Sequence, residues 1–302
     1  MADTSRKVLV YGATGLQANP VVWKLLQQGH TPYVLTRHAE RAAAMQAAGA
    51  QIVTGDMADL ASLEAASVGM DAVALLIPFF LENPMIAPTL GKNAIDAAKA
   101  AGVKLIVWNT SGPVLPVRTG NPGADVRLEI ADYLRESGVP HIIIAPTGYM
   151  ENLLGPWTAP NVAAESQLTY PNTDETRIGW IAAEDVGALV AAAIERPELA
   201  GSMFNVSGLE NLDGRELAER FTQALGRPIR YVAMEPEEFG AVLDKVFGPG
   251  AGAGAAAEYR RMRDEPDPTP MFHAMPPVLA KLPVRMTSMV EWVAKHRAAL
   301  GG

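Results

Sequence analysis

The chain has 302 residues, of which 49% are hydrophobic, and its 25 Lys and Arg against 33 Asp and Glu leave a net charge of −8. It contains no cysteine, which excludes disulfide scaffolds, cysteine zinc sites, iron–sulfur clusters and cysteine nucleophiles. The negative charge repels phosphate backbones and argues against a nucleic-acid-binding protein. The length and apolar content suit one large α/β domain, or one domain with a smaller satellite.

No segment of the sequence resembles a targeting signal or a membrane span. The first apolar stretch, which begins at Lys7, is only about five residues long, too short for a signal-peptide core. No window approaches the roughly twenty apolar residues that cross a bilayer. We therefore expect a cytoplasmic protein without membrane association.

In the first half, short β-branched runs alternate with Ala- and Leu-rich runs of helical spacing. The predicted strands are Lys7–Tyr11, Tyr33–Thr36, Gln51–Thr54, Ala72–Ile77, Leu105–Trp108 and His141–Ala145. The predicted helices between them are Ala18–Gln28, Glu40–Ala48, Leu60–Ser67, Pro88–Ala101 and Val126–Glu136. Uniformly apolar strands with helices between them predict an α/β, doubly wound parallel sheet that is covered on both faces. Ligands are then expected beyond the carboxyl ends of the strands.

After Pro146 the rhythm is less regular. The predicted elements are a strand Ile178–Ile181, a helix Asp185–Glu195, a strand Met203–Val206, a helix Asp213–Leu225, a strand Arg230–Ala233, a helix Glu237–Phe247 and a final helix Ser288–Leu300. The glycine-rich stretch 248–256 is predicted to be a flexible loop. We expect one domain over residues 1–152, completed by a later sheet strand near 202–206, and a smaller, mostly helical part over residues 153–302.

The strongest motif is Gly12-Ala13-Thr14-Gly15-Leu16-Gln17-Ala18, which follows a predicted strand and opens a predicted helix. Gly12 permits a tight turn, and Gly15 lets the backbone approach a pyrophosphate that the helix amides would hold. This context is typical of a Rossmann dinucleotide-binding unit, whereas the alternative is a tight turn without a ligand. The predicted cofactor contacts in this loop are Gly12, Thr14, Gly15, Leu16 and Gln17.

The residues after the next three strands refine the cofactor. A carboxylate after the second strand would bind the ribose hydroxyl of NAD, but this chain has Arg37, which suits the 2′-phosphate of NADP. Asp56 and Met57 follow the third strand, where an adenine edge would lie, although Asp56 could instead cap the next helix. Pro78 and Phe79 follow the fourth strand and would border the nicotinamide ribose, unless Phe79 is a core or interface residue. The expected cofactor is therefore NADP(H).

Several motifs together resemble the NmrA-like branch of the atypical short-chain dehydrogenases/reductases. These are the glycine loop at Gly12, the pair Gly55-Asp56, the run Trp108-Asn109-Thr110-Ser111-Gly112, the segment Pro146–Leu153, and the element Trp180–Gly187. The branch includes quinone reductases, the isoflavone and pinoresinol reductase group, and redox-sensing regulators. The resemblance spans roughly residues 7–235 and implies a Rossmann fold with a C-terminal substrate-binding part.

The catalytic residues that the resemblance implies are altered here. Classical members use a Tyr-x-x-x-Lys pair to pass a proton, but Gly123 and Arg127 stand in those two places. Arg127 could hold the nicotinamide ribose or polarise a substrate carbonyl, or could merely decorate a helix. Ser111 matches the family serine, or is a turn residue. Tyr149 is the nearest replacement phenol if it faces the cleft, but it could equally be packed.

The remaining candidates concern the substrate. Five histidines show no metal-ligand spacing, so no metal site is predicted. Met262, Met271 and Met275 could line an apolar pocket with Phe272, or fill the core. The predicted substrate contacts are Asn152, Phe80, Met271 and Phe272.

Two functions are compatible with these residues. The first is an NADPH-dependent reductase that transfers hydride to a small conjugated or aromatic substrate of quinone, enone or aryl-ether type. The second is a non-catalytic NADP(H)-sensing regulatory protein with a protein partner, which the loss of both Tyr and Lys motivates. A sugar-nucleotide epimerase or dehydratase is disfavoured by the same loss. A homodimer is compatible with the sequence.

Overall fold

The computed structural model describes residues 5–79, 84–118, 120, 122–264 and 270–302. In the first half the strands are β1 Lys7–Val10, β2 Thr31–Thr36, β3 Gln51–Thr54, β4 Ala72–Leu76, β5 Leu105–Asn109 and β6 His141–Pro146. The helices between them are α1 Asn19–Gln27, η1 Ala39–Ala42, α2 Ala43–Ala47, α3 Leu60–Ser67, η2 Pro84–Ile86, α4 Ala87–Ala100 and α5 Pro122–Glu136.

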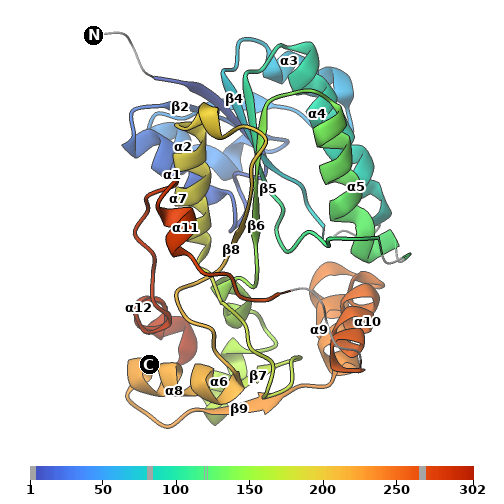
Figure 1. Ribbon diagram of the computed structural model, residues 1–302. Helices are drawn as coiled ribbons and strands as arrows, with labels where there is room; N and C mark the ends of the chain where they lie inside the picture. The colour runs from blue at the N-terminus through green and yellow to red at the C-terminus, as the bar shows by residue number, and fades with distance from the viewer. Residues whose placement is uncertain (1–4, 80–83, 119, 121, 265–269) are drawn as a thin grey trace.

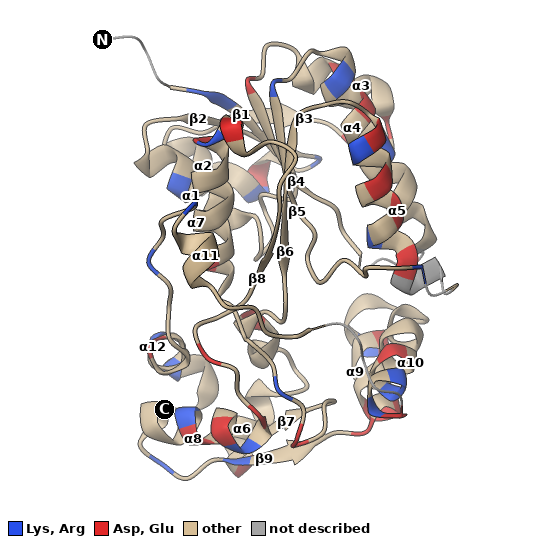
Figure 2. Cartoon of the chain, in the orientation of Figure 1, with Lys and Arg blue, Asp and Glu red and all other residues tan. Residues whose placement is uncertain are grey.

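A seven-stranded, wholly parallel sheet in the order β3-β2-β1-β4-β5-β6-β8 forms the centre of the larger part of the molecule (Figure 1). Alternate residues of each strand enter two cores, because successive side chains point to opposite faces. Val8 and Val10 pack with α1 and α7, whereas Leu9 packs with α3, α4 and α5. The central strands carry no Lys, Arg, Asp or Glu (Figure 2), which confirms the doubly wound α/β fold.

The second half of the chain alternates between this sheet and a smaller part. Its elements are η3 Met150–Leu154, α6 Ala159–Glu165, β7 Gln167–Tyr170, α7 Ala183–Ile194, η4 Pro197–Leu199, β8 Met203–Val206, α8 Gly214–Leu225, β9 Arg230–Ala233, α9 Pro236–Phe247, α10 Ala251–Asp264, α11 Pro276–Leu279, α12 Met289–Lys295 and η5 Arg297–Leu300. The helix α7, the strand β8 and the segment around α11 join the larger core. We call the seven-stranded sheet with its helices the large part and the remainder the small part.

The small part is built on a two-stranded parallel sheet, β7–β9. The helices α6, α8 and α12 and the strand β7 enclose a separate core in which Phe221 and Trp292 are fully buried. The strand β7 and the helix α6 were not predicted, because each is too short to show a clear hydrophobic period. β8 is the later sheet strand predicted near 202–206.

The predicted strand Ile178–Ile181 is wrong. This extended segment makes two isolated bridges, from Ile178 to Leu212 and from Ile181 to Tyr149. Its two ends pair with different neighbours, one in each part of the molecule, so no continuous ladder forms.

The predicted flexible loop over 248–256 is also wrong from Ala251 onward, because α10 begins there. The glycines permit close helix packing: a Cβ on Gly252 would lie 1.9 Å from the carbonyl oxygen of Gly240 on α9. Tertiary contact thus overrides the low helix propensity of glycine.

Another close contact lies within the large part, between α7 and α1. A Cβ on Gly187 would lie 2.6 Å from Cβ of Pro20, in the first turn of α1. The glycine that closes the Trp180–Gly187 motif therefore lets α7 approach the helix that follows the Gly12 loop.

Candidate active site

The loop between β1 and α1 has the conformation that a phosphate site requires. Gly12 has φ +68°, in the region that favours glycine, and a Cβ there would lie 3.1 Å from the Leu76 side chain. The N–H of Gly15 donates to the Gly12 carbonyl oxygen (2.9 Å), and a Cβ on Gly15 would lie 3.3 Å from that oxygen. The turn is therefore tight at both glycines, and both are exposed.

The other predicted loop residues lie between these glycines and α1. Leu16 is exposed, Thr14 and Gln17 are partly buried, and the buried Oε1 of Gln17 has no hydrogen-bond partner among the described residues. The loop ends at the positive end of the α1 dipole, where helix amides bind anions.

The structure brings together two residues that were predicted separately at the adenine end. Nη1 of Arg37 lies 3.5 Å from Oδ2 of Asp56, and the Arg37 side chain is 68% exposed. The helix α3 is capped by Asp59 rather than by Asp56. The carbonyl oxygen of Met57 accepts a hydrogen bond from Nδ2 of Asn93 (2.9 Å), which ties this loop to α4.

Arg127 is held at the same edge of the sheet, beside the loops that follow β4 and β5. Its Nε donates to the carbonyl oxygen of Thr110 (2.8 Å), its Nη2 donates to that of Ser111 (3.4 Å), and its guanidinium lies 4.2 Å from the Phe79 ring centroid. Phe79 also packs against the large core, whereas Pro78 is exposed. Arg127 therefore does more than decorate α5, because it joins the loops that follow β4 and β5.

The guanidinium remains a cation at neutral pH. Burial lowers the pKa of Arg127 to about 10, while the neighbouring Tyr149 and Glu258 raise it. Glu258 lies on α10 of the small part, so a charge of the small part acts on Arg127 in the large part.

The sequence left open whether Tyr149 faces the cleft or is packed in the interior. In the structure it is packed. It is 3% exposed, and its hydroxyl donates to Oδ1 of Asn109 (3.0 Å). Burial raises its pKa above the usual value, so the phenol is neutral. The N–H of Ser111, a residue with φ +58°, donates to the same oxygen (2.9 Å). Asn109 thus links two of the three predicted catalytic residues.

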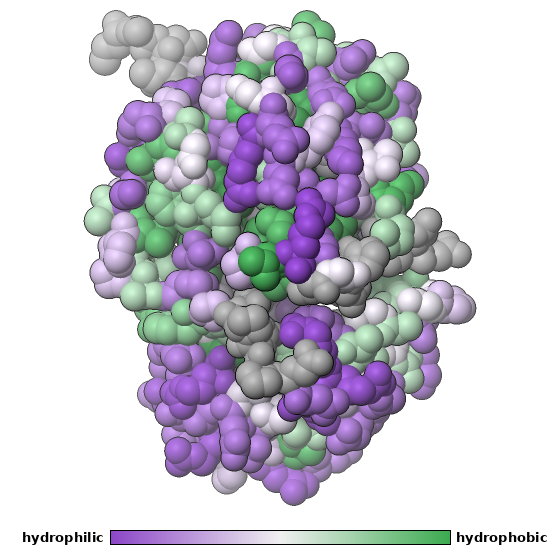
Figure 3. Space-filling model, turned by 45° about the vertical axis from the view of Figure 1, so that its right-hand side comes forward, coloured by the Kyte–Doolittle hydropathy of each residue, from purple (hydrophilic) through white to green (hydrophobic). Residues whose placement is uncertain are grey.

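Asn152, a predicted substrate contact, lies beside a cluster of aromatic rings in the small part. Nδ2 of Asn152 donates to the Tyr170 hydroxyl (3.5 Å), which lies 3.0 Å from the Tyr259 hydroxyl. Rings of Trp157, Tyr170, Phe239 and Tyr259 meet at centroid distances between 5.1 and 6.1 Å, mostly edge to face. Figure 3 shows apolar residues exposed near the level where the two parts meet.

The methionines do not gather into one cluster. Met271 packs against the small core and accepts the Gly179 N–H through its carbonyl oxygen (2.7 Å), whereas Met275 is buried in the large core. Phe272 is partly buried beside Gly179. Phe80, the fourth predicted substrate contact, lies outside the described residues.

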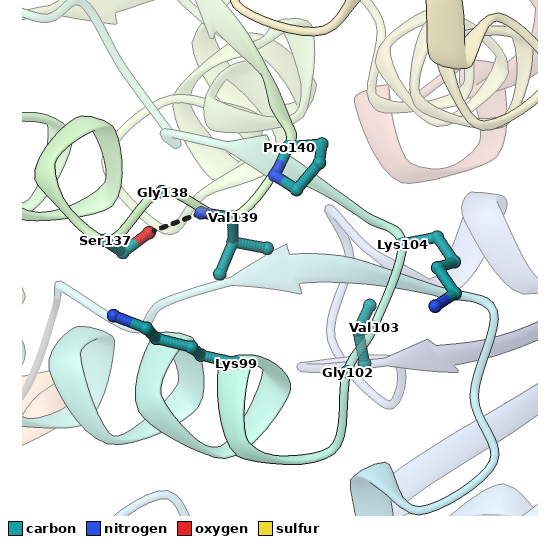
Figure 4. A pocket seen from close by; sticks show the side chains of 8 residues that line it. All are labelled: Lys99, Gly102, Val103, Lys104, Ser137, Gly138, Val139 and Pro140. Carbon is teal, nitrogen blue, oxygen red and sulfur yellow. Dashed lines mark hydrogen bonds between the residues drawn. The ribbon is translucent and has the colours of Figure 1, made fainter.

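A separate hollow lies at the amino-terminal edge of the sheet (Figure 4). It is lined by Lys99, Gly102, Val103, Lys104, Ser137, Gly138, Val139 and Pro140. It lies around the carboxyl-terminal ends of α4 and α5, and none of its lining residues carries a carboxylate or an imidazole. Within the described ranges, no three His, Cys, Asp or Glu gather into a metal-binding group, and no helix has the length and apolarity to cross a membrane.

A sequence profile of the NmrA-like family matches residues 4–293. The chain belongs to the NmrA-like family. It is 32% identical to an NAD(P)H azoreductase from Xenophilus azovorans over 76% of this chain and 78% of that protein.

Two solved structures share the fold of this NmrA-like protein. A triphenylmethane reductase from Citrobacter sp., complexed with NADP(H), is 18% identical with a TM-score of 0.78, over 96% of this chain and 99% of that one. An NADPH-dependent quinone oxidoreductase from Escherichia coli, complexed with NADPH, is 21% identical with a TM-score of 0.73, over 95% and 99% of the two chains.

Sequence reasoning did not single out three residues of this site. Asn109 is the polar last residue of an otherwise apolar strand, and the carboxyl ends of such strands are where ligands bind. That position could have identified it. Tyr170 and Tyr259 are 89 residues apart and meet only through tertiary packing, so no local sequence pattern could identify them.

Proposed function

We propose that this NmrA-like protein is an NADPH-dependent reductase that transfers hydride to a small conjugated or aromatic substrate. The observation that carries the proposal is the shared edge of the sheet. The tight glycine loop follows β1 and Arg37 follows β2, and Arg127 on α5 is held by the carbonyl oxygens of Thr110 and Ser111, which follow β5. All three therefore lie at the carboxyl ends of the strands, where doubly wound folds bind ligands.

The chain's residues suit NADPH. The exposed turn at Gly12 and Gly15 and the start of α1 would hold the pyrophosphate. The exposed guanidinium of Arg37 would pair with the 2′-phosphate, since the residues directly after β2 offer no carboxylate for a free ribose hydroxyl. Asp56 lies beside Arg37 and would orient it.

When bound, the nicotinamide supplies hydride to an electrophilic carbon or nitrogen of the substrate. Arg127 would stabilise the negative charge that develops on the substrate, because it is a cation held in place by two backbone carbonyls. The Ser111 hydroxyl would hydrogen-bond the same group. Tyr149 keeps its proton on Asn109, so we assign the balancing proton to water.

The aromatic cluster that includes Tyr170 and Tyr259 on the small part supports a flat, conjugated substrate, and Glu258, the chain neighbour of Tyr259, acts on Arg127. A flat conjugated molecule would lie between these rings and Arg127. Quinones, enones and aryl ethers fit this description, and the azoreductase and dye-reductase activities in the names of the relatives add azo and triphenylmethane dyes.

The test is NADPH oxidation, followed by absorbance, against a panel of quinones, enones, aryl ethers and azo dyes. We expect saturable turnover with at least one class and a large loss of kcat in Arg127→Gln. Arg215→Gln, which removes the same charge from exposed α8, should behave as wild type. Tight NADPH binding without turnover of any compound would contradict the reductase and favour the NADP(H) sensor.

A further inference from the structure

Asn109 carries a polar group that the proposed mechanism leaves unused. It is 3% exposed at the end of β5, and its Oδ1 accepts hydrogen bonds from the Ser111 N–H and the Tyr149 hydroxyl. Because a backbone N–H can only donate, Oδ1 must face Ser111, and this fixes which way the carboxamide points. The Nδ2 end therefore faces away from these partners.

That Nδ2 is buried and has no hydrogen-bond partner among the described residues. Buried amide groups in native proteins are nearly always hydrogen-bonded, and each exception calls for a physical reason. A ligand oxygen supplied from outside the chain would be such a reason.

The position of Asn109 indicates which part of a ligand it would meet. Asn109 is in register with Leu76 of β4, and Leu76 contacts the Gly12 turn. On the other side, Asn109 holds Ser111, whose carbonyl oxygen binds Arg127. Asn109 thus lies between the glycine loop and Arg127, and Arg37 and Asp56 follow β2 and β3 on the far side of β1.

We propose that Asn109 is both a positioning residue and a ligand contact of the reductase site. Its Oδ1 holds Ser111 in the left-handed conformation, and its Nδ2 donates to a carbonyl oxygen at the nicotinamide end. This inference rests on the proposed function. The carbonyl belongs either to the nicotinamide carboxamide or to the reducible substrate.

The test compares three variants with wild type. Asn109→Asp keeps acceptor oxygens for Ser111 and Tyr149 but removes the amide donor. Asn109→Leu removes both the acceptor oxygen and the amide donor, and leucine is a side chain of similar volume. Asn211→Asp makes the same chemical change at a half-buried asparagine near α8 and serves as the control. Thermal melts establish that each variant folds.

We expect Asn109→Asp to lose about tenfold or more in one of two measurements, since one hydrogen bond in a buried site is worth about that factor. A weaker NADPH Kd assigns the cofactor carbonyl, whereas a lower kcat/KM at unchanged NADPH Kd assigns the substrate carbonyl. Asn109→Leu should lose more in the same measurement, and Asn211→Asp should lose nothing.

Acidification provides a readout that a purely structural role would not change. Protonation of the new carboxyl in Asn109→Asp restores an O–H donor, so its defect should shrink as the pH falls, while wild type shows no such recovery. Arg127 and Glu151 are the charged groups that act on the adjoining Tyr149, and we expect them to influence the pKa of the new carboxyl.

Wild-type values of Kd and kcat/KM in Asn109→Asp, or a loss that acidification does not reduce, would overturn the inference and leave the proposed function standing. If wild type binds NADPH without turnover, the Kd comparison alone decides. If wild type does not bind NADPH, the proposed function fails and this inference fails with it.

Discussion

At the scale of single residues, Arg37 is expected to determine cofactor choice. Arg37→Asp should weaken NADPH binding by about tenfold to a hundredfold, because one charge-assisted pair with the 2′-phosphate is lost and a repulsion replaces it. NADH binding should change much less. Titration of both cofactors by fluorescence quenching measures the two affinities.

The control for Arg37 is Arg215→Asp, which makes the same change of charge on α8 at a 76% exposed side chain. It separates a local contact from the general effect of a more negative protein. Equal losses for NADPH and NADH in Arg37→Asp would contradict the assignment to the 2′-phosphate.

Several candidate site residues could be chosen from the sequence, because ligands of doubly wound folds bind beyond the carboxyl ends of the strands. Gly12, Arg37, Asp56 and Phe79 each follow a predicted strand, and parallel strands bring such positions to one edge. The directions of side chains could not be predicted from the sequence. Two placements of Tyr149 therefore remained possible, and the pairing of Arg37 with Asp56 was not predicted.

At the scale of elements, replacing a glycine of α10 by alanine is expected to have opposite effects on stability at two positions. Gly252→Ala should destabilise the protein by about 1–3 kcal/mol, because the new Cβ would lie 1.9 Å from a carbonyl oxygen of α9. Gly254→Ala should stabilise it by about 0.5–1 kcal/mol, since nothing lies within 4 Å and alanine favours helices. Urea unfolding of both variants measures these free energies, and the same sign for both would refute the packing argument.

The elements of the large part were predicted closely because each carries a strong local pattern. Strands such as Gln51–Thr54 and helices such as Leu60–Ser67 have the same bounds in the sequence prediction and in the structure. The failures occur where tertiary contact decides: α10 forms because α9 offers a close surface, and the extended segment around Gly179 pairs with two separate neighbours.

At the scale of the whole molecule, Glu151 joins the two parts. Its carboxylate accepts hydrogen bonds from Nε1 of Trp292 on α12 (3.0 Å) and from the N–H of Ala183 at the start of α7 (2.9 Å). Burial raises its pKa above the ordinary value, and these hydrogen bonds lower it only in part.

The raised pKa of Glu151 predicts a specific pH dependence of stability. As the pH falls through the raised pKa, the folded protein takes up a proton that the unfolded chain does not yet bind, so acidification stabilises the folded state down to an unfolded pKa of about 4.3. The difference in unfolding free energy between wild type and Glu151→Gln should therefore move in favour of wild type from neutral pH to about pH 4.5.

Urea unfolding across that pH range measures the difference, and Glu64→Gln on the exposed face of α3 controls for loss of a surface charge. A difference for Glu151→Gln that stays constant with pH, or moves in favour of the variant, would contradict the linkage.

The alternation of the chain between its two parts has a consequence for engineering. The buried residues of the small core come from three separate stretches, 150–182, 212–229 and 289–300, with α7, β8 and α11 returning to the large core between them. A chimera with a single breakpoint near residue 152 would take β6 from one parent and its neighbour β8 from the other. Transfer of substrate preference between NmrA-like proteins should therefore graft these stretches together with α9 and α10, which carry Phe239 and Tyr259, and leave the sheet and its cofactor loops from one parent.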